Sequence, residues 1–248
     1  MIISTNQQEE LIPWKPKHIL YVIVGGAIMN IACYLILKEL IRISPEATQF
    51  FKDGKGTGVT MFISYIIQLI SFLLPIYFIG KKIIKTTWQE VLGFHPVSGK
   101  TILFSVFLAQ CTSLFVFGML TFAMWLSHTK EIPGFSGGQE PLGSFFGTSG
   151  ESYLFAFLSV SILAPLVEEL FFRGMIQSTI EKYLPAISGI ILSSAIFSLS
   201  HFQFQVALPL FIMGLILGTL FKKTGSLIPG IIFHGINNSL YILLEIWK

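Results

Sequence analysis

Residues 153–174 read "YLFAFLSVSILAPLVEELFFRG". The first fifteen of these residues carry no charge, and two glutamates and an arginine follow within the next six. A long apolar run is typical of a membrane helix, which satisfies its own backbone hydrogen bonds in lipid. An ionisable side chain at membrane depth costs a few kcal/mol and is therefore a functional candidate. The stretch predicts a membrane helix that carries a polar site.

The whole chain has the composition of a membrane protein. It has 248 residues, of which 53% are hydrophobic and 12% charged, with a mean hydropathy of +0.74; soluble domains carry about 25% charged residues. Alternating strand patterns are absent. We therefore predict an all-α fold, a polytopic bundle of seven to eight transmembrane helices in a lipid bilayer. The apolar runs are His18–Leu37, Val59–Gly80, Thr101–Leu126, Tyr153–Val167, Ala186–Ser200, Val206–Phe221 and Leu227–Trp247.

Charge supports a multi-pass protein of the cell membrane. The first fourteen residues contain Glu9 and Glu10 rather than a basic stretch, so the first span is expected to be retained. With seven spans, ten basic residues fall in inner segments and six in outer ones, which favours an inside N-terminus. Such an alternating path would place His201 nearer the outer face. The net charge of +3 gives no indication of nucleic-acid binding.

One membrane domain with two halves is expected. The longest irregular stretch, residues 127–151, is rich in glycine, proline and serine and predicts a loop. Residues 1–126 form the first three helices, without an ionisable residue deep in their apolar runs. Residues 152–248 hold the polar and ionisable residues that lie within apolar runs, so we expect any functional site in this half.

Helical spacing separates the three charges of the opening stretch. Glu169 and Arg173 are four residues apart, share a face and can pair as a structural support. Glu168 is rotated by about 100° and has no partner in its own helix. A desolvated, unpaired carboxylate can serve as a general base, so Glu168 is the candidate for chemistry.

A helical hairpin would bring His201 to the depth of Glu168. If the helix turns back at Leu184-Pro185, the two residues each lie sixteen residues from the turn. At 1.5 Å per residue, both are then about 24 Å from it. His201 alone could also be an interfacial residue.

The last span offers hydrogen-bond donors. His234 and Asn238 are four residues apart and lie on one face. Together they could donate two hydrogen bonds to an oxyanion. Alternatively, Asn238 could bond a neighbouring helix.

At these residues the sequence resembles the CPBP family of intramembrane proteases (CAAX protease and bacteriocin-processing, also called Abi). Its three motifs are EExxxR, FxxxH and HxxxN. Here they read "EELFFR" at 168–173, "FSLSH" at 197–201 and "HGINN" at 234–238. The resemblance covers about residues 152–242.

The resemblance implies a helical-bundle hydrolase that cleaves peptides near a membrane surface. It implies that Glu168 and His201 activate water, that His234 and Asn238 support the oxyanion, and that Glu169 and Arg173 hold the architecture. The expected partner is a peptide or protein substrate at the membrane, either a CAAX tail or a small peptide such as a bacteriocin.

Three alternatives remain open. Glu168, His201 and His234 could bind zinc with a water as the fourth ligand, although we favour a metal-free, cofactor-free site, since HExxH is missing. The same pocket could serve a non-catalytic scaffold or immunity protein. A transporter is less favoured, because repeated halves with broken helices are not apparent.

Overall fold

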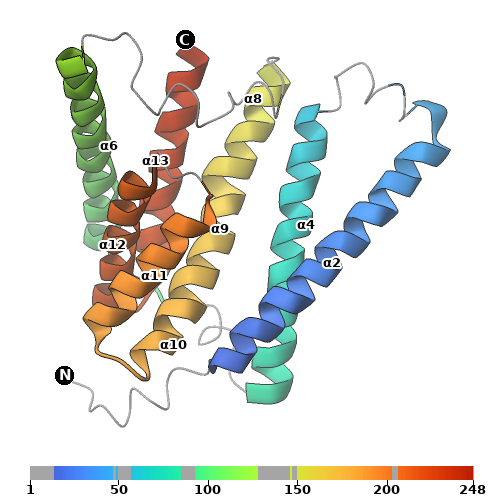
Figure 1. The fold of residues 1–248 in the computed structure, drawn as a ribbon, viewed down its shortest axis with the longest axis horizontal. Helices are drawn as coiled ribbons and strands as arrows, with labels where there is room; N and C mark the ends of the chain where they lie inside the picture. Colours follow the sequence, from blue (N-terminus) through green and yellow to red (C-terminus); the bar gives the residue numbers. More distant parts are fainter. Residues whose placement is uncertain are drawn as a thin grey trace.

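The computed structural model describes residues 14–46, 49, 57–84, 93–127, 146, 150–202 and 206–247. All regular secondary structure in this part of the chain is helical, so the predicted all-α bundle is confirmed. The structure has seven helical segments (Figure 1): α2 (Pro16–Ile43), α4 (Thr57–Phe78) with η1 (Ile79–Ile84), α6 (Gly99–Ser127), a compound helix over Gly150–Glu181, α11 (Ala186–Ser200), α12 (Ala207–Thr224) and α13 (Ile228–Trp247). The predicted loop over 127–151 falls largely outside the described residues.

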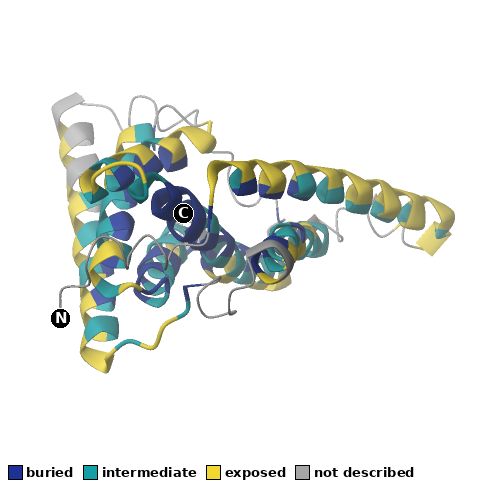
Figure 2. Ribbon diagram, turned by 90° about the horizontal axis from the view of Figure 1, so that it is seen from below, coloured by how far each residue is buried: buried dark blue, intermediate teal, exposed yellow. Residues whose placement is uncertain are grey.

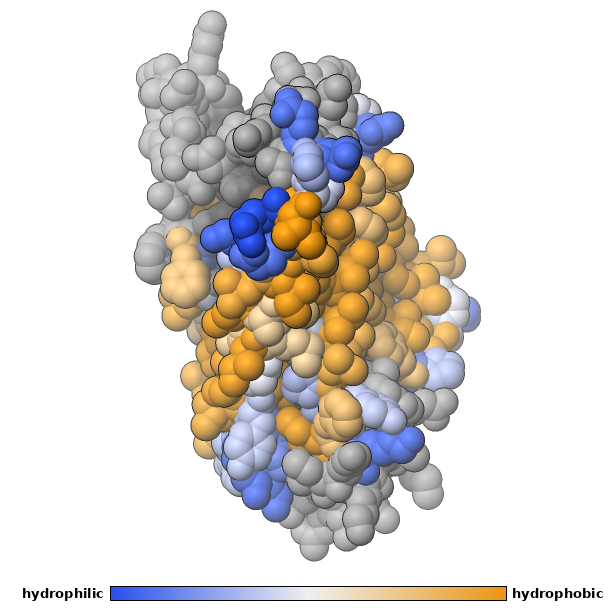
Figure 3. Space-filling model, turned by 90° about the vertical axis from the view of Figure 1, so that its right-hand side faces the viewer, coloured by the Kyte–Doolittle hydropathy of each residue, from blue (hydrophilic) through white to orange (hydrophobic). Residues whose placement is uncertain are grey.

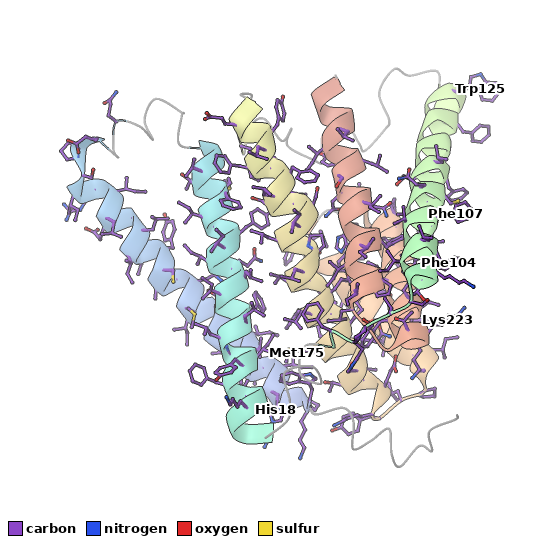
Figure 4. The ribbon with its side chains drawn as sticks, turned by 180° about the vertical axis from the view of Figure 1, so that it is seen from behind. His18, Phe104, Phe107, Trp125, Met175 and Lys223 are labelled. Atoms are coloured by element: carbon purple, nitrogen blue, oxygen red, sulfur yellow. The ribbon has the colours of Figure 1, made fainter. Side chains whose placement is uncertain are left out.

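Five of these helices are long and apolar enough to cross a membrane: Pro16–Ile43, Gly58–Lys81, Gly99–Val116, Gly150–Glu181 and Ala207–Thr224. An apolar surface separates two hydrophilic ends in Figure 3. Phe104, Phe107 and Trp125 project outward from α6 in Figure 4, and each is more than half exposed. Exposed aromatic side chains on a membrane helix face lipid, so the structure supports a membrane protein.

One end of the bundle is basic. Lys15 and Lys17 begin α2, and the end of α10 brings Lys182 within electrostatic range of His18 beside them. Lys222, at the end of α12, lies 2.8 Å from Glu181. His18 and Lys223 both lie toward the lower end of the molecule in Figure 4. We call this the basic end; it holds the start of α2 and the ends of α10 and α12.

The hairpin of α11 and α12 starts and finishes at this basic end. The turn after α10 is at 182–185, as the sequence predicted, and α11 has only 15 residues. At 1.5 Å per residue it rises about 22 Å, which is less than the roughly 30 Å of a bilayer core. In Figure 1 the hairpin occupies the lower part of the molecule. The helix α11 alone is therefore too short to cross a bilayer core, whereas the path of seven alternating spans required it to cross.

The compound helix over 150–181 contains two π-helical segments between its α-helical parts. It consists of α8 (Gly150–Ala156), η2 (Phe157–Leu163), α9 (Ala164–Glu169), η3 (Leu170–Gln177) and α10 (Ser178–Glu181). The segments η2 and η3 are π-helical. Short π segments frequently occur at functional sites, and these two flank the helical turn that carries both glutamates.

A ladder of polar contacts holds the compound helix against α12. Arg173 Nη2 donates to Gly214 O at 3.3 Å, and Gln177 Nε2 donates to Gly218 O at 3.0 Å. One turn further, Glu181 pairs with Lys222. In each of the three pairs the residue of α12 lies 41 positions after its partner in the compound helix. A constant separation means that the two helices run parallel.

The other helices pack more loosely. The helix α2 buries only His18, Val22 and Gly26, a stripe with a spacing of four residues, and is otherwise largely exposed in Figure 2. A Cβ on Gly26 would lie 3.2 Å from Ser71 O, so α2 approaches α4 closely along this stripe.

The tight packing inside the hairpin gives a prediction for Gly214→Ala. A Cβ at Gly214 would lie 2.8 Å from Ser194 Cβ and 3.0 Å from its Cα. Because α11 must shift to make room, we expect a loss of about 1–3 kcal/mol of stability, measured by unfolding in detergent micelles. Gly118→Ala in α6 is the control, since its Cβ would meet nothing within 4 Å. Equal stabilities for both variants would contradict the close packing.

Candidate active site

Two of the three charged residues in the stretch 168–173, Glu169 and Arg173, form a buried ion pair. Arg173 Nη1 donates to Glu169 Oε1 at 3.0 Å, and both side chains are almost completely buried. The spacing of four residues had predicted this contact. A buried pair is tolerated when hydrogen bonds satisfy its remaining polar atoms, and Gly214 O accepts a second bond from Arg173.

Glu169 also forms a hydrogen bond with a histidine from another helix. His234 Nδ1 of α13 lies 3.1 Å from Glu169 Oε1, and both side chains are buried. A Cβ at Gly230 would lie 3.1 Å from Glu169 Oε2, so a side chain at this position would crowd the carboxylate. Since a carboxylate only accepts, His234 Nδ1 carries the proton. Its Nε2 then points away from Glu169.

Glu168 faces both histidines. Its Oε2 lies 3.9 Å from His201 Nε2 and 3.8 Å from His234 Nε2. The Glu168 side chain is 27% exposed, but Oε2 itself is buried and, within the described residues, has no hydrogen-bond partner. An unpartnered buried carboxylate oxygen between two imidazoles is costly unless it serves a function.

Phe197 fixes the second histidine and forms a wall of the site. Its carbonyl oxygen lies 2.8 Å from His201 Nδ1. A carbonyl only accepts, so Nδ1 is the protonated nitrogen of His201. The fully buried Phe197 ring contacts the rings of His201 and His234 edge-on, with ring centroids 4.8 and 5.8 Å apart. Its centroid lies 4.6 Å from Arg173 Cζ.

Asn238 is one turn further along α13 and makes a contact with the compound helix. Its Nδ2 donates to Val160 O in η2 at 2.8 Å. The adjacent Asn237 instead accepts from Ser113 Oγ of α6 at 2.9 Å. The two asparagines thus tie α13 to different neighbours, and only Asn238 binds the helix that carries Glu168.

The structure therefore brings Glu168, His201 and His234 together and pairs Glu169 with Arg173. Two links were not predicted. The Glu169–His234 hydrogen bond joins residues 65 apart in different helices, and no spacing rule signals such a contact. The acceptor of Asn238 is a backbone carbonyl, so no residue type identifies it.

The predicted zinc alternative depends on Glu168, His201 and His234. Among the described residues, no group of three or more His, Cys, Asp or Glu side chains is arranged to hold a metal ion. Zinc binding by these three residues therefore stays a prediction from the sequence, and we derive no step through a metal.

Comparison with known proteins agrees with the motifs. Residues 150–240 match the family model described as type II CAAX prenyl endopeptidase Rce1-like. The matched segment contains all six candidate residues, so the resemblance to the CPBP intramembrane proteases is confirmed here. The match covers less than half of the chain and shows that this segment is similar to a family of prenyl endopeptidases. No match was found among curated proteins or among solved structures.

The buried ion pair gives a stability prediction for Arg173→Met. Removing the guanidinium leaves the Glu169 carboxylate buried without its charge partner, so we expect a loss of about 3–5 kcal/mol. Arg42→Met is a matched control, because Arg42 pairs with Glu39 at 2.7 Å but is 70% exposed. Exposed pairs contribute little, so this control should unfold like wild type in the same detergent titration. Similar losses in both variants would contradict the proposed importance of burial.

Proposed function

We propose that the protein is an intramembrane endopeptidase that hydrolyses a peptide bond with a water molecule activated by Glu168 and His201. The observation that carries the proposal is the buried, unpartnered Glu168 Oε2 between His201 Nε2 and His234 Nε2. The family match of residues 150–240 supports peptidase chemistry.

The hydrogen-bond roles at Glu168 and His201 favour water as the bridging group. Phe197 O holds the proton of neutral His201 on Nδ1, so Nε2 presents a lone pair. Glu168 Oε2 is also an acceptor, and the two atoms are 3.9 Å apart. A donor of two hydrogens must lie between them, and a water oxygen about 2.8 Å from each acceptor fits.

The reaction then follows from these positions. Glu168 Oε2 takes one proton as the water oxygen attacks the carbonyl carbon of the scissile bond, while His201 Nε2 accepts a hydrogen bond from the other O–H and orients the water. The tetrahedral intermediate collapses as the C–N bond breaks. The proton held by Glu168 passes to the leaving nitrogen, which departs as an amine, and the new carboxylic acid releases its remaining proton to solvent.

His234 and Asn238 are proposed to stabilise the oxyanion. For this role His234 must carry a proton on Nε2 as well as on Nδ1, which bonds Glu169. With His234 charged, the positive charges of His234 and Arg173 balance the negative charges of Glu168 and Glu169. A neutral sum reduces the cost of keeping four ionisable groups at membrane depth.

The proposed substrate is a peptide tail at the cytosolic face of the cell membrane. Basic segments stay inside, so we assign the basic end to the cytosol. His234 lies six residues after the start of α13 at Ile228, about 9 Å along the helix axis. The site is therefore nearer the basic end than the opposite one. The family description names CAAX prenyl endopeptidases, which makes prenylated C-terminal tails the first substrates to test.

The proposed base is tested by Glu168→Gln. The amide cannot take the proton from water, so we expect kcat to fall by about 100-fold or more. The assay is cleavage of an internally quenched fluorogenic peptide by purified protein, with thermal unfolding to show that the variant is folded. Glu151→Gln removes an equal charge at the exposed start of α8 and should keep full activity.

Retained cleavage by folded Glu168→Gln would rule out this base. If wild type cleaves no tested peptide, and Glu168→Gln and His201→Ala also leave a cellular phenotype intact, a non-catalytic scaffold would be the better description.

The metal-free mechanism gives a separate prediction for chelation. EDTA or phenanthroline should leave the rate of peptide cleavage unchanged, because Glu168 and His201 are sufficient to activate water. Metal analysis of the purified protein accompanies the assay. Activity that is lost on chelation and restored by zinc would favour the alternative in which Glu168, His201 and His234 bind the metal.

A further inference from the structure

Pro165 interrupts the backbone hydrogen bonds of the compound helix three residues before Glu168. In the π-helical segment η2, the Ala164 amide donates to Ser159 O, five residues back. The same spacing would pair Val160 O with the amide of residue 165. Residue 165 is proline, which has no N–H. Val160 O therefore receives no hydrogen bond from position 164, whose N–H is used by Ser159 O, or from position 165, which has no N–H.

Asn238 donates a hydrogen bond to this carbonyl oxygen. Its Nδ2 lies 2.8 Å from Val160 O, although the two residues are 78 apart in the chain. A carboxamide nitrogen carries two hydrogens, so this bond uses one and fixes the amide plane. The second hydrogen remains for another acceptor.

Close packing holds α13 in place for this contact. A Cβ at Gly235 would lie 2.5 Å from Ser161 O, so only glycine allows α13 to approach η2 this closely. His234 and Asn238 lie on either side of this glycine along the helix. The approach of α13 to η2 thus places both side chains relative to Glu168.

We propose that Pro165 is a positioning residue: by lacking an N–H, it reserves Val160 O as the acceptor that orients Asn238 toward the oxyanion. This inference rests on the proposed endopeptidase function.

The test compares two replacements that differ in one hydrogen-bond donor. Pro165→Ala restores an N–H at position 165, which can compete with Asn238 for Val160 O. Replacement of Pro165 by lactic acid, the α-hydroxy analogue of alanine, gives the same methyl group on an ester and no N–H. We expect Pro165→Ala to lower kcat roughly 10-fold or more with KM nearly unchanged, since one oriented oxyanion donor contributes about 100-fold or more. The lactic acid variant should keep kcat close to wild type.

A matched control and a double variant separate positioning from general stability. Pro75 lies inside α4 and contacts Gly25, so Pro75→Ala changes a helix proline elsewhere in the membrane; its kcat should equal that of wild type. Asn238→Ala removes the positioned group. Combining it with Pro165→Ala should cause little further loss of kcat, because both act through one contact.

A readout independent of cleavage uses the side-chain amide of Asn238. Its ¹⁵N NMR signal should shift in Pro165→Ala but not in Pro75→Ala, while the signal of Asn237, which donates to Phe233 O at 2.8 Å, stays in place. An unshifted Asn238 signal, or equal kcat losses for the alanine and lactic acid variants, would overturn the inference. If instead wild type and Glu168→Gln cleave equally, the proposed function fails, and the NMR result still decides the contact.

Discussion

The carboxylate of Glu169 is the contact on which the site depends. It accepts from Arg173 within its own helix and from His234 across to α13. Arg173 in turn bonds α12 through Gly214 O. Three helices therefore meet at one buried anion, which limits how far any of them can shift or rotate. Such an arrangement is costly to bury and is stable only when complete, so it specifies one packing of the helices that carry the candidate site.

Two backbone carbonyl oxygens orient the other polar side chains of the site. Phe197 O selects the protonated nitrogen of His201, and Val160 O fixes the amide of Asn238. Glu168 differs, because its Oε2 is a buried carboxylate oxygen that faces two imidazoles and has no hydrogen-bond partner among the described residues. An acceptor held by rigid neighbours and left available is expected of a preorganised site.

The sequence predicted the fold class and the members of the site, but not how the members contact one another. Apolar runs identify membrane helices, and the spacing of Glu169 and Arg173 predicts their pair, because helix geometry alone decides both. The turn before α11 was equally readable from Leu184-Pro185. Contacts between helices depend on their rotation and tilt, which no local pattern encodes, so the Glu169–His234 bond was missed. The depth of His201 stays a prediction, because an apolar run of 15 residues does not reveal whether it crosses or returns.

The position of His234 near the start of α13 has a consequence for the peptide substrate proposed above. From the start of α13 to His234 is about 9 Å, and an extended chain advances about 3.3 Å per residue. Roughly three residues of an unfolded tail can therefore reach the level of the imidazole. Under the proposed function, a substrate with such a tail would keep its folded part in water, and no transmembrane helix would have to unwind before its bond is cut.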